Sequence, residues 1–534
     1  MRIQQSRRIT GPHMVLDGPG AAAEVVFEGE DAEAWLAQWQ QAVSELARRL
    51  GWSGHTAVRR WPGGATVALA CPVDLALAAT DVVEQAAGLG PGEERIAEAI
   101  RELERPRLRA AVAASADIGR SCLVEGDEVV FGMGPGAVGF HAEALPDELP
   151  SVGQIPFVFV TGTNGKTTTT RLLARMATLA GFQVGQTSSD GIWVAGEWLT
   201  RGDWTGPQAA RLLLRHPECT FAVLETARGG MMRRGLVCGG ARAAVVTNVS
   251  ADHLGEWGLF DIHDMADAKL TVARGVAPDG VLVVNGDDDA LAASIRRNPP
   301  TVAVLRFRDG SSVGAEAYAL DGHLWLCGEP LVAEAELAFA AGGLLRHGVQ
   351  NALAAALTAH AMGLPRAAIG AALREFTASV ADNRGRMNLF DVRGARVVVD
   401  YCHTPDAVAH FVPLVAQWAG RTTVVVGQAG DRTDALIDAL GDAVLRLDPA
   451  RVILKELSGH LRGRVPGEVT GRLRLRLERE GGPQILVAAN EREAAIRALA
   501  GVREGDLVLL FTHEDLDEVL SILTAAGAVP RESW

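Results

Sequence analysis

Short apolar runs alternate with stretches of helical periodicity along the middle of the chain. The runs lie at 157–160, 220–224, 243–247 and 280–284, and a glycine-containing turn joins the first to a helix expected over 168–179. Unbroken apolar runs of this length are typical of strands buried on both faces of a parallel sheet. The pattern therefore predicts a central α/β domain whose helices cover a parallel-type sheet.

The same alternation returns in the last third of the chain. Helical stretches at 350–362 and 367–376 precede it, and further apolar runs follow at 396–399, 422–426, 451–454, 484–487 and 507–511. Strands that alternate with helices in this way predict a second, smaller Rossmann-like α/β domain.

The first 150 residues follow a mixed pattern. Strands are predicted at 22–27 and 65–70 and helices over 31–50 and 73–87, which indicates an α+β domain of unknown role. Two prolines at 145–150 interrupt any regular element, so this segment is predicted to be a linker. We therefore expect an α/β protein with three domains, at 1–150, 151–384 and 385–534.

The composition is that of a globular protein with an acidic balance. A chain of 534 residues is too long for one hydrophobic core, which agrees with several domains. The net charge of −14 argues against a general nucleic-acid-binding protein, because such proteins need a basic surface to displace phosphate counterions. The six cysteines form no C-x-x-C pair, so neither a disulfide framework nor a zinc site is indicated.

No targeting or membrane segment is recognisable in the sequence. The polar N-terminus is not followed by an apolar run, and no uninterrupted apolar stretch reaches the roughly 18 residues that a membrane helix needs. We therefore expect a cytoplasmic protein with neither membrane nor nucleic-acid partners. The oligomeric state stays open, with a homo-oligomer among the alternatives.

The turn after the first central strand has the features of a phosphate-binding loop. It reads Thr161-Gly162-Thr163-Asn164-Gly165-Lys166-Thr167-Thr168. Glycines let the backbone approach phosphate oxygens, the lysine supplies a point charge, and the threonine hydroxyl after it is placed to bind Mg²⁺. Val160 stands where the general pattern has its first glycine, so a chance Gly-Lys-Thr sequence is the alternative.

The loop resembles the ATP loop of the Mur ligases and folylpolyglutamate synthetases. The resemblance continues, in family order, through the Mur-like part of the cyanophycin synthetases. It is carried by SSDG at 188–191, GDWTGP at 202–207, ETARGG at 225–230, NVSADHL at 248–254, NGDD at 285–288, GRMN at 385–388 and DYCHTPD at 400–406. The resemblance as a whole extends from about residue 157 to residue 530.

The resemblance implies a set of metal-binding residues. Glu225 ends an apolar run and corresponds to a Mg²⁺ ligand beside Thr167, while His253 and Lys269 correspond to residues near a second Mg²⁺. Lys269 aligns with a lysine that Mur ligases often carbamylate, which would turn a cation into an anionic ligand. A plain lysine on a helix surface is the alternative.

The resemblance also implies an ATP site that the loop shares with later residues. Asn351 corresponds to an adenine-contacting residue, although a helix N-cap explains it equally well. Arg386 corresponds to a residue near the phosphates, Asp400 to one at the ribose, and His403 to the same nucleotide edge. The residues expected to bind ATP are Gly162, Thr163, Asn164, Gly165, Lys166, Thr167, Thr168, Asn351, Arg386, Asp400 and His403.

The activity that the resemblance implies is ATP-dependent amide formation from small-molecule or peptide substrates. A carboxylate attacks the γ-phosphate to give an acyl phosphate and ADP, and an amine then displaces phosphate. Phosphoryl transfer depends on positioning and on charge neutralisation. The residues expected to act in catalysis are Lys166, His253, Lys269 and Arg386.

Two departures from the cyanophycin synthetases bear on the substrates. About 150 residues precede the loop, too few for both an N-terminal domain and an ATP-grasp domain, so we expect only one half-reaction of that polymer's synthesis. The acidic run expected after Lys455-Glu456 is replaced by neutral and basic residues, which puts a basic amine in doubt. The substrate residues suggested are Asp190, Asp431, Arg432, Ser458, His460, Arg462 and Arg464, with a solvated basic loop as the alternative for the two arginines of 462–464.

Two other classes of function remain as alternatives. One is a P-loop NTPase or phosphotransferase of another kind, which the motifs around Arg386 and Asp400 disfavour. The other is a catalytically silent, ligase-derived binding protein, but such a protein would be expected to have lost Lys166, Glu225 or His253.

Overall fold

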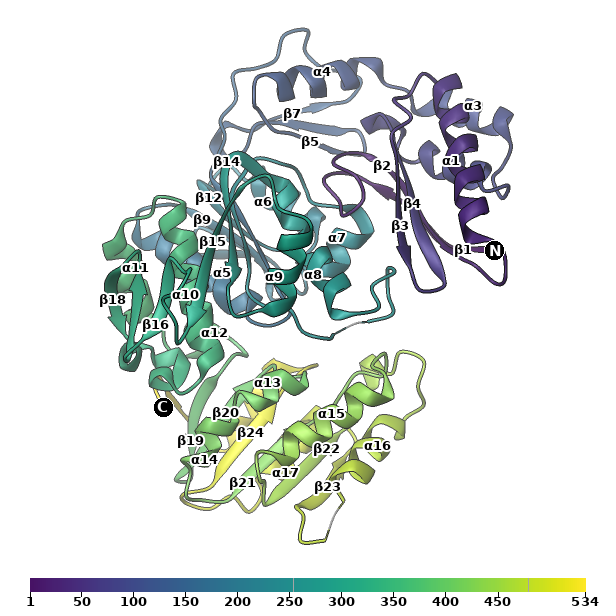
Figure 1. Cartoon of the computed structure of the whole chain (residues 1–534). Coiled ribbons are helices and arrows are strands. Elements are labelled where there is room, and N and C mark those ends of the chain that lie inside the picture. The colour runs from purple at the N-terminus through teal and green to yellow at the C-terminus, as the bar shows by residue number, and fades with distance from the viewer. Residues whose placement is uncertain (253, 479) are drawn as a thin grey trace. The chain divides into compact units, whose positions relative to one another are not determined.

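The computed structural model describes residues 1–252, 254–478 and 480–534, and they form two compact units (Figure 1). Unit 1 comprises Met1–Phe307 with Ala354–Ala368, and unit 2 comprises Arg308–Leu353 with Ile369–Trp534. Within the described residues, every helix is too short or too polar to cross a membrane.

The N-terminal part of unit 1 is an antiparallel sheet covered by helices. Its strands run in the order β1-β2-β4-β3, namely β1 (Arg2–Ile9), β2 (Gly20–Val26), β4 (Gly64–Ala70) and β3 (Thr56–Trp61). The helices α1 (Ala32–Arg49) and α2 (Ala78–Ala86) place Trp39 and Val83 against alternate residues of β2 and β4, such as Val25 and Val67. The other alternate residues, such as Ala22 and Ala68, pack in a second small core with Ile9 and Leu16, so β2 and β4 are buried on both faces.

Shorter elements complete the region before residue 150. They are η1 (Val73–Leu75), α3 (Glu93–Leu103), α4 (Pro106–Asp117), η2 (Gly134–Gly136) and an antiparallel sheet of β5 (Cys122–Glu125), β6 (Glu128–Phe131) and β7 (Val138–His141). Leu108 of α4 packs with Val129 and Phe131 of β6 in a small core.

The central part of unit 1 is built on a mostly parallel sheet. Its strands follow the order β11-β10-β9-β12-β8-β13-β14-β15, and neighbours pair in parallel except that β10 pairs antiparallel with both β9 and β11. The bounds are β8 (Phe157–Thr161), β9 (Val184–Ser188), β10 (Gly191–Val194), β11 (Glu197–Arg201), β12 (Phe221–Glu225), β13 (Ala241–Val246), β14 (Val276–Asn285) and β15 (Ala303–Asp309). The expected parallel-type sheet is confirmed.

Helices cover both faces of this sheet. The helix α5 (Lys166–Leu179) packs on β8, β9 and β12. The opposite face packs against α6 (Pro207–Leu214), α7 (Arg228–Arg234), α8 (Ile262–Leu270), η3 (Thr271–Gly275) and α9 (Asp289–Arg297). Strands covered on both faces need apolar residues at every position, which explains their unbroken apolar runs.

Unit 2 contains an antiparallel meander and a doubly wound sheet. The meander is β16 (Ala317–Leu320), β17 (His323–Leu326) and β18 (Glu329–Ala333). The sheet has the order β23-β22-β21-β24-β20-β19-β25, and neighbours pair in parallel except that β19 pairs antiparallel with both β20 and β25. Its bounds are β19 (Asn388–Val392), β20 (Ala395–Asp400), β21 (Thr422–Val426), β22 (Arg451–Lys455), β23 (Gln484–Ala488), β24 (Leu507–Phe511) and β25 (Val529–Arg531).

Helices on both faces of this sheet form two separate cores. One face packs against α13 (Pro405–Ala409), α14 (Val412–Ala416), α15 (Asp434–Leu445) and α16 (Glu468–Leu477), and the other against α17 (Glu491–Leu499) and α18 (Leu516–Ala525). The expected Rossmann-like α/β arrangement is confirmed. The remaining helices are η4 (Glu334–Glu336), η5 (Ala338–Gly343), α10 (Arg346–Ala361), α11 (Arg366–Glu375), α12 (Val380–Asn383) and η6 (Ser458–His460).

Several element predictions need correction. The strand β1 went unpredicted because its alternating residues are largely polar, and the helix expected over 73–87 is divided into η1 and α2. The helix α10 begins at Arg346 and not near residue 350, so Asn351 lies inside the helix. The interpretation of Asn351 as a helix N-cap is therefore wrong.

Candidate active site

The predicted phosphate loop connects β8 to α5 in unit 1. Gly162 and Gly165 both have positive φ, and Gly165 is the N-cap of the helix that begins with Lys166. A Cβ atom on Gly162 would lie 1.8 Å from the hydroxyl oxygen of Thr247, so no larger residue fits there. The loop therefore presents backbone N–H groups at a helix N-terminus, which is the arrangement that binds phosphate.

Residues at the end of β13 hold this loop in place. The Asn248 side chain accepts a hydrogen bond from the backbone N–H of Asn164 at 2.9 Å and donates one to its carbonyl oxygen at 3.0 Å. The Thr247 hydroxyl donates to the same carbonyl at 2.6 Å, and the Thr163 hydroxyl accepts from the N–H of Ser250 at 3.0 Å. The loop is thus tied to the segment that also carries Asp252.

Oxygen donors meet beside the first turn of α5. The Thr167 hydroxyl lies 3.2 Å from the carboxylate of Glu225, the last residue of β12, and 3.3 Å from the hydroxyl of Ser189. Lys166 folds over the loop, and its ammonium group donates to the carbonyl oxygens of Gly162 and Thr163 at 3.1 and 2.9 Å. Two hydroxyls and a carboxylate form the kind of oxygen donor set that Mg²⁺ prefers.

Lys269 lies on the buried side of α8 and is 4% exposed. Burial lowers the pKa of its amine well below the usual value, and the nearby charge of Lys166 lowers it further, while Asp252 and Asp288 act in the opposite direction. The alternative of a lysine on a helix surface is therefore wrong. The other residue expected near a second metal, His253, lies outside the described residues.

Lysine is rare in this protein, and its positions are informative. The sequence contains only Lys166, Lys269 and Lys455, whereas arginine supplies the other 48 of its 51 basic side chains. Lys166 lies at the phosphate loop, and Lys269 and Lys455 are buried. An ammonium group is compact and loses its proton readily when buried, and arginine reproduces neither property.

The predicted substrate residue Asp190 forms an ion pair with Arg171 of α5, whose side chain is buried. The backbone N–H of Asp190 also donates to the Ser188 hydroxyl at 3.2 Å. Asp190 thus lies next to Ser189, at the carboxyl end of β9, close to the oxygen donors around Thr167.

In unit 2, the predicted nucleotide residues Arg386 and Asp400 lie beside Tyr401. The Arg386 guanidinium is 4.4 Å from the centre of the Tyr401 ring. Asp400 accepts a hydrogen bond from the backbone N–H of Met387 at 2.7 Å. Burial raises the pKa of the Asp400 carboxyl to about 6, although Arg386 and the N–H groups of Met387 and Cys402 favour its ionised form.

His403 belongs to the same cluster, together with a histidine that the sequence did not indicate. The rings of His403 and His513 lie 5.2 and 5.4 Å from the Tyr401 ring, and 6.2 Å from each other. One ring nitrogen of His513 bonds the Cys402 carbonyl oxygen at 2.9 Å, while Nδ1 is buried without a hydrogen bond. Burial lowers the pKa of His513 well below its usual value.

Two loops that carry the other predicted substrate residues lie against each other. The backbone N–H of Gly430 donates to the carbonyl oxygen of His460 at 2.9 Å, and Arg462 pairs with Asp431. Arg432 is buried and bonds the same Asp431 at 2.8 Å. Ser458 begins the short helix η6 that ends at His460.

Arg464 is bonded within the chain. Its guanidinium donates to the carbonyl oxygens of Gly430 and Arg432, both at 2.9 Å, and to the carboxylates of Asp434 and Glu468 at 2.8 and 2.7 Å. Through these bonds Arg464 joins the two loops. Since its guanidinium donors are used within the chain, the structure favours a structural role for Arg464 over substrate binding.

Buried Lys455 and Glu491 hold a third loop at this edge of the sheet. Lys455 pairs with Glu491 and donates to the Phe511 carbonyl oxygen at 2.5 Å. The Glu491 carboxylate accepts hydrogen bonds from the backbone N–H groups of residues 513, 514 and 515 at 2.7 to 2.9 Å. The Glu514 side chain in turn accepts from the N–H of Gly459 at 2.8 Å, so this loop also supports η6.

The predicted residues of unit 2 therefore share one edge of the sheet. Asp400 ends β20, the loop of Asp431 follows β21, η6 follows β22, and His513 follows β24. These strands are neighbours in the order β22-β21-β24-β20, and ligands of open α/β sheets bind at such carboxyl ends.

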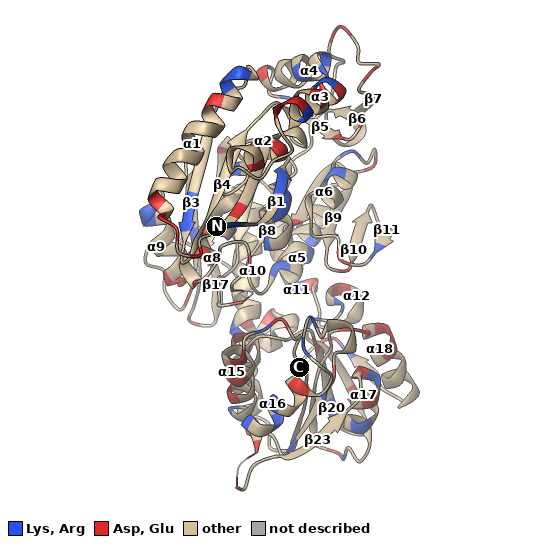
Figure 2. Cartoon of the chain, turned by 90° about the vertical axis from the view of Figure 1, so that its right-hand side faces the viewer, with Lys and Arg blue, Asp and Glu red and all other residues tan. Residues whose placement is uncertain are grey.

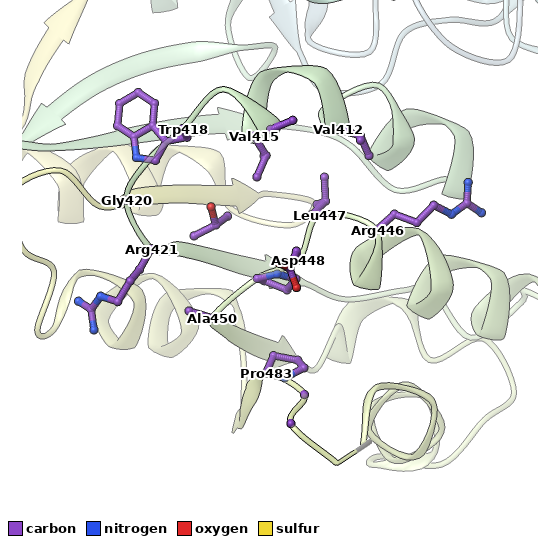
Figure 3. Close-up of a pocket in the computed structure, with 15 residues that line it drawn as sticks. Val412, Val415, Trp418, Gly420, Arg421, Arg446, Leu447, Asp448, Ala450 and Pro483 are labelled. Atoms are coloured by element: carbon purple, nitrogen blue, oxygen red, sulfur yellow. The ribbon is translucent and has the colours of Figure 1, made fainter.

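A pocket of about 550 Å³ lies at the opposite edge, where β21, β22 and β23 begin (Figure 3). Trp418, Arg421, Arg446, Asp448 and Pro483 are among the residues that line it. None of the predicted site residues does.

Some residues that shape the site were not assigned a role from sequence. Asn248, Ser189 and His513 each follow the carboxyl end of a parallel strand, and that position is the signal that could have identified them. Asp288 follows β14 in the same way and accepts a hydrogen bond from the N–H of Val249 at 2.6 Å, but it is also the N-cap of α9, which explains it from sequence without a role in the site. Among the described residues, no three His, Cys, Asp or Glu side chains converge as a metal cluster.

Comparison with known proteins identifies two domain models in this chain. Residues 160–359 match the Mur ligase middle domain, and residues 385–512 match the Mur ligase, glutamate ligase domain.

Individual relatives match much of the same region. Cyanophycin synthetase of Synechocystis sp. is 36% identical over 395 residues, which cover 71% of this chain and 45% of that protein. Cyanophycin synthetase of Trichormus variabilis is 38% identical over 331 residues, covering 60% and 36%. The chain thus spans less than half the length of these relatives.

A more distant relative and a solved structure extend the comparison. UDP-N-acetylmuramoyl-L-alanyl-D-glutamate–2,6-diaminopimelate ligase of Vibrio vulnificus is 28% identical over 340 residues, 58% of this chain and 66% of that protein. The structure of E. coli FolC in complex with DHPP and ADP aligns with a TM-score of 0.50 at 19% identity, over 70% of this chain and 89% of that chain. This structural likeness supports the fold.

Proposed function

Since the chain belongs to the Mur ligase family through its middle and C-terminal domains, we propose that it is an ATP-dependent carboxylate–amine ligase. It joins a carboxylate to an amino acid or another amine in an amide bond and releases ADP and phosphate. The relatives named as cyanophycin synthetase and as a diaminopimelate ligase support this reaction class. The division into domains at 1–150, 151–384 and 385–534 is part of the proposal.

The observation that carries the proposal is the phosphate loop with Glu225 and Lys269 beside it. Lys166 donates to the loop's carbonyl oxygens, and from this position its flexible side chain can turn to phosphate oxygens. Thr167 and Glu225, 3.2 Å apart, would hold one Mg²⁺ between them. When bound, Mg²⁺ neutralises the charge of the phosphates and polarises them for transfer.

A second Mg²⁺ would lie near His253 and Lys269. Burial lowers the pKa of the Lys269 amine, which favours the neutral form that reacts with CO₂ to form a carbamate. The carbamate carries a negative charge and two oxygens, which converts the lysine into a metal ligand. The negative charge of the carbamate would also replace the repulsion between Lys269 and Lys166 by an attraction.

The reaction then follows two displacement steps. A carboxylate oxygen of the first substrate attacks the γ-phosphorus of ATP, the bond to the β-phosphate oxygen breaks, and ADP leaves. The amine nitrogen of the second substrate attacks the carbonyl carbon of the acyl phosphate, phosphate leaves, and the amine loses a proton. Lys166 and the N–H groups of residues 162–167 stabilise the charge on the transferred phosphate.

The proposal also assigns roles in nucleotide and amine binding to residues of unit 2. Asp400 accepts hydrogen bonds from the ribose hydroxyls, Arg386 binds the phosphates, His403 lies at the same nucleotide edge, and Asn351 contacts adenine. The loops of Asp431 and His460 bind the amine substrate, with Arg462 available to its carboxylate after leaving Asp431. Since ATP is the phosphoryl donor, we place the reaction in the cytoplasm.

ATP-dependent release of ADP with a panel of amino acids and short peptides tests the function. We expect release only when a carboxylate and an amine are both present, together with a product whose mass equals the two substrates less one water. Lys166→Ala should abolish release, whereas Arg2→Gln, at the exposed end of β1, should leave it unchanged. Phosphate release with water alone would support an NTPase, and no turnover with any substrate pair would support a silent binding protein.

A further inference from the structure

Four arginine side chains gather in unit 1 where β1, α6 and α7 meet. They are Arg8 of β1, Arg211 of α6, and Arg233 and Arg234 of α7; we call them the arginine cluster. Figure 2 shows basic residues on β1 and on α6. The cluster is a local excess of positive charge in a protein whose net charge is −14.

Hydrogen bonds through Thr10 hold the three elements together at this point. The backbone N–H of Thr10 donates to the carbonyl oxygen of Arg234 at 2.8 Å, and its hydroxyl accepts from the Arg211 guanidinium at 3.0 Å. The Arg234 guanidinium reaches the carbonyl oxygen of Arg8 at 3.3 Å. The side chains of the cluster are therefore presented by a connected backbone framework.

Close backbone packing makes this framework rigid. A Cβ atom on Gly11 would lie 2.2 Å from the carbonyl oxygen of Leu236, and one on Gly235 would lie 2.5 Å from the carbonyl oxygen of Gly11. The N–H of Leu236 also donates to the carbonyl oxygen of Pro12 at 2.7 Å. Such an approach is open only to glycine, so the residues after β1 are fixed on the end of α7.

The cluster lacks the carboxylates that would balance its charge. Among the described residues, none of its four arginines forms an ion pair, whereas neighbouring Arg7 and Arg228 each have a glutamate partner. Glu125 exerts a favourable effect on Arg211 from beyond ion-pair distance. Burial lowers the pKa of Arg211 and of Arg234, and the other arginines lower that of Arg234 further.

A partly buried guanidinium with no anion beside it is costly, because its lost hydration is not replaced by an opposite charge. In place of an anion, Arg233 has only a weak cation–π contact, since its guanidinium lies 6.0 Å from the centre of the Trp257 ring. An anion that entered between the four side chains would receive several charge-assisted hydrogen bonds, and it would remove their mutual repulsion. The arrangement is therefore complementary to a negatively charged group.

The helix α7 connects the cluster to the proposed reaction site. Its first residue, Arg228, lies close enough to Lys269 to disfavour that lysine's charge, as does Lys166. From Arg228 to Arg234 the helix rises by about 9 Å, at about 1.5 Å per residue. An extended peptide covers the same distance with about three residues.

We propose that the arginine cluster binds an anionic group of the carboxylate substrate, about three residue lengths from the carboxylate that is activated. The substrate is then an extended molecule with at least two negative groups, of which an acidic peptide is the simplest example. The inference rests on the proposed ligase function for the identity of the molecule that binds. The chemistry at the cluster, anionic oxygen against guanidinium, is shared by carboxylates and phosphates.

Calorimetric titration without ATP tests binding separately from turnover. The probes are tetraglutamate, its neutral counterpart tetraglutamine, and a tetrapeptide with an N-terminal phosphoserine. We expect the anionic probes to bind and tetraglutamine not to bind, with affinity falling roughly tenfold or more for each of Arg8→Gln and Arg211→Gln. The matched control Arg2→Gln, on the same strand, should bind as the wild type does.

A further variant separates the loss of the cluster from misfolding. Arg233→Gln changes an exposed side chain, and it should weaken binding even if the other variants fail to fold. Equal affinity for tetraglutamate and tetraglutamine, or unchanged affinity in all the cluster variants, would overturn the proposal. The comparison of carboxylate with phosphoserine probes decides which anion the cluster prefers.

Turnover supplies the second readout. With acidic peptides as carboxylate substrates, the cluster variants should raise KM for the peptide about tenfold or more while kcat and the KM for ATP stay unchanged. A fall in kcat at constant KM would contradict the proposal, since it would indicate a role in the reaction step. If no peptide supports ADP release but tetraglutamate still binds at the cluster, the ligase function fails and the anion site stands.

Discussion

The carboxyl group of Asp400 is predicted to make ATP binding sensitive to pH. Its pKa is raised to about 6 by burial, so the group gains a proton as the pH falls through 6. Ionised Asp400 is the stronger acceptor for ribose hydroxyls. The affinity for ATP is therefore highest well above pH 6 and falls as the pH drops through 6. The KM for ATP should rise about tenfold between pH 7 and pH 5.

Asp400→Asn provides the comparison for this prediction. The amide does not titrate, so the KM for ATP should be raised at pH 7 and should stay level down to pH 5. A wild-type KM that does not change across this range would mean that Asp400 is not at the ribose.

At the same scale, Lys269 is predicted to depend on CO₂. Carbamate formation needs a neutral amine, which burial favours by lowering the pKa of Lys269, and the modified side chain would hold metal. Removal of CO₂ and bicarbonate should slow ADP release, and adding bicarbonate should restore it.

Lys269→Ala and Lys269→Arg should both lose roughly 100-fold or more in kcat, since several kcal/mol of charge stabilisation disappear with the metal. Full activity in Lys269→Arg would exclude the carbamate, because a guanidinium does not form one.

At the scale of elements, the ion pair of Lys455 and Glu491 fixes the loop after β24. Glu491 accepts three backbone N–H groups there, and Lys455 supplies the positive charge that keeps the carboxylate ionised. Lys455→Met leaves that carboxylate buried without its partner, and we expect a loss of about 3–5 kcal/mol in the free energy of unfolding. Denaturant unfolding measures this loss, and a loss below about 1 kcal/mol would show that the pair is not needed.

The loop held by Lys455 also carries His513 and Glu514, which lie against Tyr401 and Gly459. The two predicted binding regions of unit 2 therefore share one support. Sequence alone gave no reason to connect Lys455 with His513, since 58 positions separate them.

At the scale of the whole molecule, the N-terminal residues pack with the central residues in unit 1. Buried Arg7 joins the two regions, since it pairs with Glu24 at 2.9 Å and donates to the carbonyl oxygen of Met232 at 2.8 Å. Arg7→Met should destabilise unit 1 by about 3–5 kcal/mol, because Glu24 is left buried and unpaired. Arg7→Met combined with Glu24→Leu should recover most of the loss in a denaturant titration, and failure to recover would indicate that the bond to Met232 is the larger contribution.

Much of this architecture is predictable from short stretches of sequence. The phosphate loop is one strand, one turn and one helix in succession, and the apolar runs of the central and C-terminal sheets mark strands covered on both faces. The strand β1 was missed because most of its residues are polar, and only its pairing with β2 and the burial of Arg7 in the tertiary structure explain why it forms a strand. Asn351 was misplaced at a helix start because residues 346–350 carry no strong helical pattern.

The sequence by itself determined the order of elements, the phosphate loop and the motifs of the Mur ligase family, because each depends on residues that are close together in the chain. Only the tertiary structure decided that Lys269 is buried, that Asn248 holds the loop, that β20, β21, β22 and β24 present their carboxyl ends side by side, and that Arg8, Arg211 and Arg234 meet. These outcomes depend on strand order and on helix packing between residues far apart in sequence. Local periodicity specifies which face of an element is buried, but not which other element covers it.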